Sequence, residues 1–143
     1  MLLEFQTIKE KLKKVAPILA KKYKLDFIII FGSYARGKIR QNSDIDIGFM
    51  GKIDFQEELN LAGVVSDLLQ TNHLDLVNLN RASPFLGNLA SREALLVYEK
   101  QKGIFADFRT YVFKRSVETK PLRDLNFNRT LNYIKKYQST LSA

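Results

Sequence analysis

Residues 31–37 of the chain read Phe-Gly-Ser-Tyr-Ala-Arg-Gly, and residues 44–47 read Asp-Ile-Asp-Ile. The first stretch completes an unbroken apolar run over residues 27–31, which ends at Gly32. A short apolar run rich in β-branched residues predicts a strand that is buried on both faces. Because glycine has no Cβ, the backbone at Gly32 can turn tightly or approach a ligand closely. The two stretches together indicate a buried strand, a tight corner and a second, acidic strand.

The corner after the first strand carries groups that suit an anion. If Ser33 begins a short helix, its hydroxyl and the first backbone N–H groups of that helix favour phosphate oxygens. Arg36 adds a planar guanidinium whose donors match the geometry of phosphate. A glycine–serine pair alone is usually just a turn, so this interpretation depends on the residues that come after the corner.

Three aspartates lie C-terminal to the corner. Asp44 and Asp46 are two positions apart on an expected strand over residues 44–50, so their carboxylates should project from one face. Like charges this close repel, and they persist most readily around a divalent cation. Asp75, on a third expected strand over residues 74–79, would complete a triad if the two strands are neighbours. Such a triad suits two Mg²⁺ ions, one orienting a nucleoside triphosphate and one activating an incoming hydroxyl.

The other patterns predict strands that alternate with helices. Apolar residues recur at helical spacing over residues 4–23, with Pro17 as a kink or a break. Asp54 and Glu57 stand at capping-box distance before a second helical stripe. Residues 94–98 are expected as a short edge strand. Further helical patterns lie at 55–70, 84–92, 104–113 (rich in aromatic residues) and 125–137. This order predicts an α/β fold with a helical C-terminal extension.

The composition excludes several kinds of chemistry. The chain of 143 residues is 45% hydrophobic and 27% charged, as expected for a single packed domain. It has no cysteine and a single histidine, which excludes disulfides, a cysteine nucleophile and a multi-histidine zinc site. A carboxylate site for a hard cation stays open. No apolar run approaches the roughly 20 residues that span a bilayer, so we expect no membrane contact and a cytoplasmic location.

The positive charge is concentrated in the last third of the chain. The net charge is +8, and residues 100–143 carry ten basic and three acidic side chains. We therefore divide the chain into a core, residues 1–99, and a helical extension of the same domain, residues 100–143, as a region for partner binding. Aromatic and arginine side chains anchor many protein interfaces, which supports that role for the extension.

The glycine–serine corner followed by the acid pair resembles the signature of the polymerase-β-like nucleotidyltransferase superfamily. Within it, residues 32–37 and 43–46 look like those of the minimal nucleotidyltransferase (MNT) group. The resemblance covers roughly residues 5–98, and it implies a small mixed sheet packed by helices. It also implies that Asp44, Asp46 and Asp75 are catalytic and bind two Mg²⁺ ions, with Asp75 as the base.

By the same resemblance, Gly32, Ser33 and Arg36 hold the triphosphate of ATP. Proteins of the MNT group typically act as antitoxins paired with HEPN ribonuclease toxins, to which they transfer AMP from ATP, onto a tyrosine. The resemblance therefore implies an antitoxin nucleotidyltransferase that forms a hetero-oligomer with its HEPN toxin.

Two other functions are compatible with the same residues. The chain could neutralise its partner by occlusion alone, as its basic, aromatic extension suggests, without using the acid triad. Alternatively, the transferase could act on a small hydroxylated molecule or on an RNA end. Nucleic acid is not the expected partner, but the basic extension is compatible with RNA as the acceptor.

Overall fold

The apolar run becomes β1 (Leu25–Phe31), an inner strand of a four-stranded sheet with the order β3-β2-β1-β4. We describe it from a computed structural model, in which residues 2–40 and 43–142 are placed. β2 (Ile45–Gly51) and β4 (Leu95–Glu99) flank β1 in antiparallel orientation, and β3 (Leu74–Asn78) runs parallel to β2 at the far edge. Side chains 27–30 are at most 3% exposed, which confirms a strand buried on both faces.

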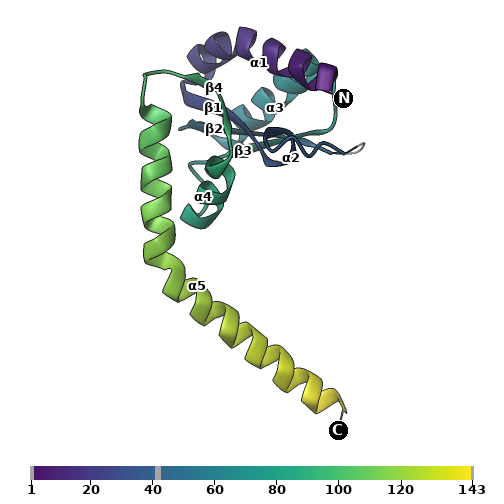
Figure 1. Ribbon diagram of the computed structural model, residues 1–143, viewed down its shortest axis with the longest axis vertical. Helices are drawn as coiled ribbons and strands as arrows, with labels where there is room; N and C mark the ends of the chain where they lie inside the picture. Colours follow the sequence, from purple (N-terminus) through teal and green to yellow (C-terminus); the bar gives the residue numbers. More distant parts are fainter. Residues whose placement is uncertain (1, 41–42, 143) are drawn as a thin grey trace.

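Helices cover both faces of this sheet (Figure 1). α1 (Leu2–Tyr23) and α3 (Phe55–Leu69) lie over one face, where they share one hydrophobic cluster with the sheet. α4 (Pro84–Arg92) and the beginning of α5 (Ile104–Ser142) pack on the other face in a second cluster. A single short turn of helix, α2 (Gly32–Ala35), follows β1 directly. The predicted α/β class and the mixed sheet are both confirmed.

The alternation along β2 decides which face carries the acidic side chain. Ile45, Ile47 and Phe49 are buried in the cluster beneath α1 and α3. Met50 belongs to the opposite cluster. Because successive strand side chains point to opposite faces, Asp46 lies on the face that α4 covers.

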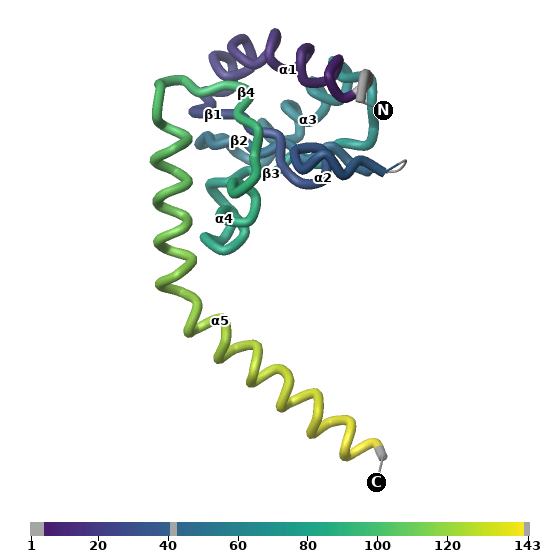
Figure 2. The backbone as a smooth tube through the Cα atoms, viewed as in Figure 1, coloured from purple at the N-terminus to yellow at the C-terminus, as the bar shows by residue number. Residues whose placement is uncertain are grey.

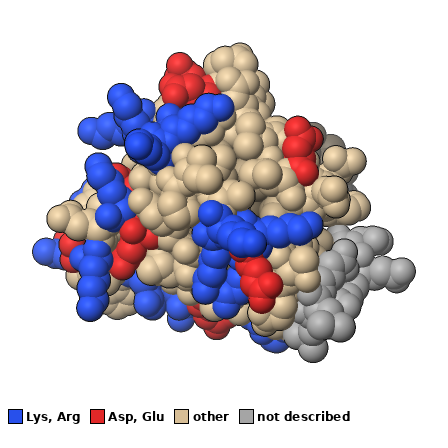
Figure 3. Space-filling view, turned by 90° about the horizontal axis from the view of Figure 1, so that it is seen from above, with Lys and Arg blue, Asp and Glu red and all other residues tan. Residues whose placement is uncertain are grey.

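α1 is one unbroken helix, although Pro17 lies inside it. Pro17 is exposed, and the apolar side of the helix, including Leu12 and Ala16, is buried against the sheet. The lysines of α1 are mostly exposed, and Figure 3 shows basic side chains spread over the side of the molecule seen from above. They form the solvated face of an amphipathic helix.

The C-terminal region differs from the expectation of two separate helical segments. It is one continuous helix of 39 residues, α5, with Pro121 inside it. Figures 1 and 2 show α5 changing direction about midway, and a proline in a helix interior is a common cause of such a bend. No helix in the described part of the chain has both the length and the apolar character that crossing a membrane requires.

Only the first part of α5 belongs to the core. Phe105, Phe108 and Val112 are buried against Phe27 and α4, as expected for core packing, whereas Phe113 is 59% exposed. Side chains 124–141 are all exposed. We call residues 124–141 the distal half of α5; in Figure 1 it extends away from the sheet.

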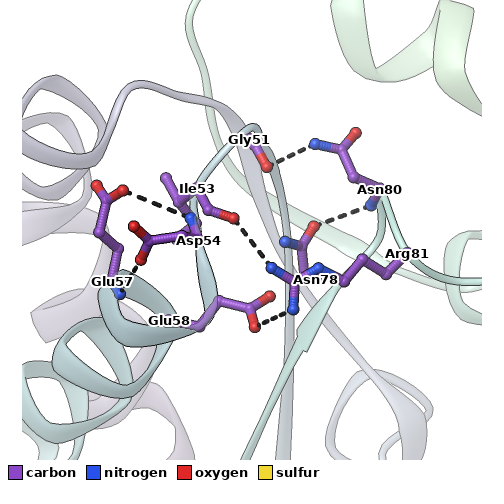
Figure 4. A network of polar contacts seen from close by, with 8 residues as sticks. All are labelled: Gly51, Ile53, Asp54, Glu57, Glu58, Asn78, Asn80 and Arg81. Carbon is purple, nitrogen blue, oxygen red and sulfur yellow. Dashed lines mark hydrogen bonds and ion pairs between the residues drawn. The ribbon is translucent and has the colours of Figure 1, made fainter.

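A polar network closes the end of the sheet where β2 and β3 finish (Figure 4). The Asn80 side-chain amide donates to the carbonyl of Gly51. Arg81 forms an ion pair with Glu58 at 2.8 Å and donates to the carbonyl of Ile53 at 3.1 Å. These contacts hold the start of α3 against the loop after β3.

The start of α3 is the capping box that the sequence predicts. The carboxylate of Asp54 accepts from the backbone N–H of Glu57 at 2.8 Å, and the Glu57 side chain accepts from the N–H of Asp54 at 3.4 Å. Both contacts appear in Figure 4. Two backbone donors that the first turn of a helix leaves unpaired are thereby satisfied.

Candidate active site

Gly32 turns the chain from β1 into α2 directly beside Asp46. Its φ is +72°, a left-handed conformation that favours glycine. A Cβ at this position would collide with Oδ2 of Asp46 and would lie 3.0 Å from its Cγ. Glycine is therefore needed here twice, once for the backbone conformation and once for the close approach to the carboxylate.

The short helix α2 begins at Gly32 rather than at Ser33, which is its second residue, and the backbone turns sharply after it. The N–H of Arg36 donates to the carbonyl of Gly32 at 3.1 Å, and the N–H of Lys38 donates to that of Ser33 at 2.9 Å. These bonds fix the corner and place Arg36 immediately after the short helix. Ser33 is half-buried and Arg36 is exposed.

β3 brings Asp75 next to Asp46. The two strands are parallel, and Asp46 stands opposite Asp75 in their register. On its other side, Asp46 is opposite Phe31, the last residue of β1. Residues directly opposite in a sheet share a face, so the two carboxylates and the Gly32 corner meet at one edge.

The electrostatic surroundings of Asp46 are unfavourable for its charge. Its pKa is raised by partial burial, then by the negative charges of Asp75 and Asp44, and it is lowered in part by Arg36. Three carboxylates and one guanidinium therefore act on one another across this edge. A cation bound here would relieve the repulsion among the carboxylates.

Asp44 is placed differently from the expectation of a shared strand face. β2 begins at Ile45, so Asp44 precedes the strand. One carboxylate oxygen of Asp44 lies 3.5 Å from Nδ1 of His73, and both side chains are largely exposed. The N–H of Ile45 donates to the carbonyl of His73 at 2.9 Å, which brings the two residues together. His73 is a partner of Asp44 that the sequence, with no register between the strands, did not reveal.

The oxygen donors at this edge have the chemistry that a hard divalent cation prefers. In the parts of the chain that the structure describes, no group of three histidine, cysteine or acidic side chains is gathered closely enough to hold a metal ion. Asp44 is the carboxylate that is directed elsewhere, toward His73. Asp44 nevertheless lies close enough to Asp46 for its charge to raise the pKa of that carboxyl.

α4 contributes a further wall that the sequence did not point to. A cavity of about 230 Å³ lies between the corner and the end of α4. It is lined by Gly32, Arg36, Leu89, Ala90, Arg92 and Glu93. Only the packing of α4 on the sheet brings Arg92 to within reach of the corner.

Comparison with known protein families assigns the chain to one of them. Residues 13–103 match the family model described as polymerase beta, nucleotidyltransferase. The chain therefore belongs to this nucleotidyltransferase family, which confirms the resemblance found in the sequence.

Among individual relatives, the similarity is to protein adenylyltransferases. The chain is 43% identical over 79 residues to MJ1217 of Methanocaldococcus jannaschii, which bears that name provisionally; the match covers 51% of this chain and 76% of the relative. It is 24% identical to the protein adenylyltransferase MntA of Aphanizomenon flos-aquae, over 92% of this chain and 95% of the relative.

Solved structures show the same fold. A chain from the crystal structure of a toxin–antitoxin with AMP-PNP superimposes with a TM-score of 0.71 at 23% identity, over 83% of this chain and 98% of the other. A chain from a complex of tri-AMPylated HEPN toxin with MNT antitoxin, from Shewanella oneidensis, gives a TM-score of 0.69 at 21% identity, over 89% and 98%.

Proposed function

We propose that this chain is an antitoxin that transfers AMP from ATP to a hydroxyl, most simply a tyrosine hydroxyl, of a cognate HEPN ribonuclease toxin. The transfer neutralises the toxin. The observation that carries the proposal is the convergence of the Gly32 corner with Asp46 and Asp75 at one sheet edge. Similarity over nearly the whole chain to an adenylyltransferase named MntA supports the choice of reaction.

In the proposed reaction, the corner holds the nucleotide. Backbone N–H groups and the hydroxyl of Ser33 receive the triphosphate, and Gly32 lets it approach the backbone closely. Arg36 neutralises part of its charge. Because phosphoryl chemistry depends on positioning and charge neutralisation, a rigid corner next to the acids is the main requirement.

Asp44, Asp46 and Asp75 are the residues that would hold Mg²⁺. When bound, the metal would neutralise phosphate charge and lower the pKa of the acceptor hydroxyl. Asp75, an exposed carboxylate on β3, takes the proton from that hydroxyl. The hydroxyl oxygen forms a bond to the α-phosphorus, the bond from this phosphorus to the bridging oxygen breaks, and pyrophosphate leaves. Since ATP is the donor, we place the reaction in the cytoplasm.

The decisive test is transfer of label from α-labelled ATP to the product of any HEPN gene adjacent to this one, with MgCl₂ present. We expect label on the toxin with the wild-type chain and none with the double variant Asp44→Asn/Asp46→Asn. EDTA should abolish transfer by the wild type. Label transfer that persists in the double variant would overturn the assignment of the acids.

A second candidate, neutralisation by occlusion, is favoured by one observation. The distal half of α5 exposes a series of apolar side chains, with Phe127 at 63% and Ile134 at 44%. Exposed apolar surface of this kind is typical of protein interfaces. We propose that residues 100–143 bind the toxin in either case. If Asp46→Asn still neutralises the toxin in cells, occlusion rather than transfer is the mechanism.

A further inference from the structure

The cavity beside the corner has an asymmetric lining. One wall is formed by Gly32 and Arg36, and the facing wall by the last turn of α4 with Arg92. Leu89 and Ala90 add apolar side chains to the lining. The cavity therefore lies between the glycine corner and a second, independent source of positive charge.

The charge of Arg36 lowers the pKa of the Asp46 carboxyl, but neither arginine of the lining is held in an ion pair within the described part of the chain. Glu93 is the one acidic residue in the lining. The lining thus carries two guanidinium groups and one carboxylate, with the carboxylate of Asp46 directly behind Gly32. Guanidinium groups are suited to phosphate oxygens.

The last turn of α4 is held in place by neighbouring backbone. Nη2 of Arg109, on α5, donates to the carbonyl oxygen of Arg92 at 3.4 Å. The N–H of Ala94 donates to the carbonyl of Ser91 at 3.4 Å, and Ser91 is 2% exposed. The backbone that carries Arg92 is thus anchored at the edge of the cavity, while its side chain is exposed.

The size of the cavity limits what it holds. Pockets for whole drug-sized ligands usually measure about 300–1,000 Å³. At about 230 Å³, this cavity is smaller than that range, and half of its lining residues are charged: Arg36, Arg92 and Glu93. It suits the charged end of a nucleotide better than the whole molecule.

We propose that Arg92 binds the triphosphate of the donor nucleotide from the α4 side, opposite Arg36. The proposal rests on the proposed function, because it takes the donor to be a nucleoside triphosphate. It adds to the corner a phosphate ligand from a different element. α4 then sets how tightly the pyrophosphate part of the donor is held.

The experiment compares nucleotide binding by calorimetry in the full-length chain, with MgCl₂ present. The probes are AMP-PNP, the imido analogue of ATP, and AMP. We expect Arg92→Gln to weaken AMP-PNP binding at least tenfold while AMP affinity changes less than twofold. Arg92→Lys should recover part of the loss, because it restores charge but not the planar fork. Lys52→Gln, an equal loss of charge at an exposed site at the far end of β2, is the control.

Each outcome decides the matter. Equal AMP-PNP affinity for wild type and Arg92→Gln, or an equal loss for AMP and AMP-PNP, overturns the proposal. Unchanged thermal melting of Arg92→Gln shows that the loss is not unfolding. If the wild type binds AMP-PNP but labels no toxin, the proposed function fails while Arg92 is still tested. If the wild type binds no nucleotide, both fail.

Discussion

At the scale of single residues, the site depends on a glycine and a carboxylate that nearly touch. Gly32 gives the backbone its left-handed turn and leaves the space that Oδ2 of Asp46 fills. Gly37 has the same φ, +72°, but a Cβ there would meet nothing within 4 Å. An alanine at Gly37 would therefore cost stability only through its backbone conformation. An alanine at Gly32 would also collide with Asp46.

The first prediction uses this pair. Gly32→Ala and Gly37→Ala should each lose about 1–2 kcal/mol of unfolding free energy, because both place alanine in a left-handed conformation. Only Gly32→Ala should also displace Asp46 and lower AMP transfer, by roughly 100-fold. Urea unfolding and label transfer measure the two effects. Equal activity of the two variants would show that the close approach does not matter for the chemistry.

The second prediction concerns the charge of Asp46. Its pKa in the folded chain lies above the ordinary value, so the folded state binds more protons than the unfolded state between those two pKa values. Stability is therefore lost as the pH rises through that interval, and the penalty is complete above it. Asp46→Asn removes the penalty. The variant should melt at a higher temperature than the wild type at pH 7, and the difference should shrink as the pH falls toward about 4.

Added MgCl₂ supplies the matching control. A cation that binds only the folded wild type raises its melting temperature. The same addition should do little for Asp46→Asn, which has lost a charged ligand. A wild type whose melting temperature does not respond to Mg²⁺ would argue against a metal site at this edge.

At the scale of elements, the two ends of β2 have different tasks. Its first residues stand beside β3 at the candidate site, with Asp46 opposite Asp75. Its last residue, Gly51, joins the polar network that fixes the start of α3. One end of β2 thus serves the candidate site, and the other end serves the stability of the fold. Mutations at the first end should change activity, and mutations at the second should change the free energy of unfolding.

The third prediction tests that separation through the capping box. Asp54→Ala removes the acceptor for the N–H of Glu57 and should cost about 1 kcal/mol of unfolding free energy. AMP transfer at 25 °C should stay within twofold of the wild type, because Asp54 lies at the opposite end of the sheet. Gln56→Ala, an exposed change in the same turn, is the comparison for stability. A large loss of transfer in the folded Asp54→Ala variant would mean that the two ends are coupled.

At the scale of the whole molecule, α5 joins a core segment to a projecting one. Its beginning is packed against Phe27 and α4, whereas the side chains of its distal half are not buried by any of the described residues. Phe127 and Ile134 are seven residues apart and lie on the same side of the helix. Basic residues such as Arg129 and Lys135 accompany them, which suits a partner with acidic groups around an apolar centre.

The fourth prediction addresses this exposed side. The double variant Phe127→Ser/Ile134→Ser should unfold within about 0.5 kcal/mol of the wild type, because both side chains are exposed. Its affinity for the HEPN toxin should fall at least tenfold. Asn128→Ser/Asn132→Ser changes another side of the same helix and should bind normally. Calorimetry with the purified toxin measures both, and equal affinities would remove the distal half from the interface.

Local patterns were enough to predict most of the elements. The apolar run ending at Phe31 and the capping box of Asp54 both depend on neighbours within a few residues. The single helix α5 was the exception. The sequence predicted two helical segments, 104–113 and 125–137, but the helix continues through the residues between them, Pro121 included. A proline removes one hydrogen bond and can bend a helix without ending it.

The sequence by itself determined which groups this protein has to offer: a glycine corner, three aspartates and one arginine, each next to an element whose pattern is local. Only the tertiary structure determined which of these groups lie close together. The parallel pairing of β3 with β2 put Asp75 beside Asp46, the loop before β3 brought His73 to within 3.5 Å of Asp44, and the packing of α4 brought Arg92 to the corner. Strand register and helix packing join residues that are distant in the chain, and no local periodicity encodes them.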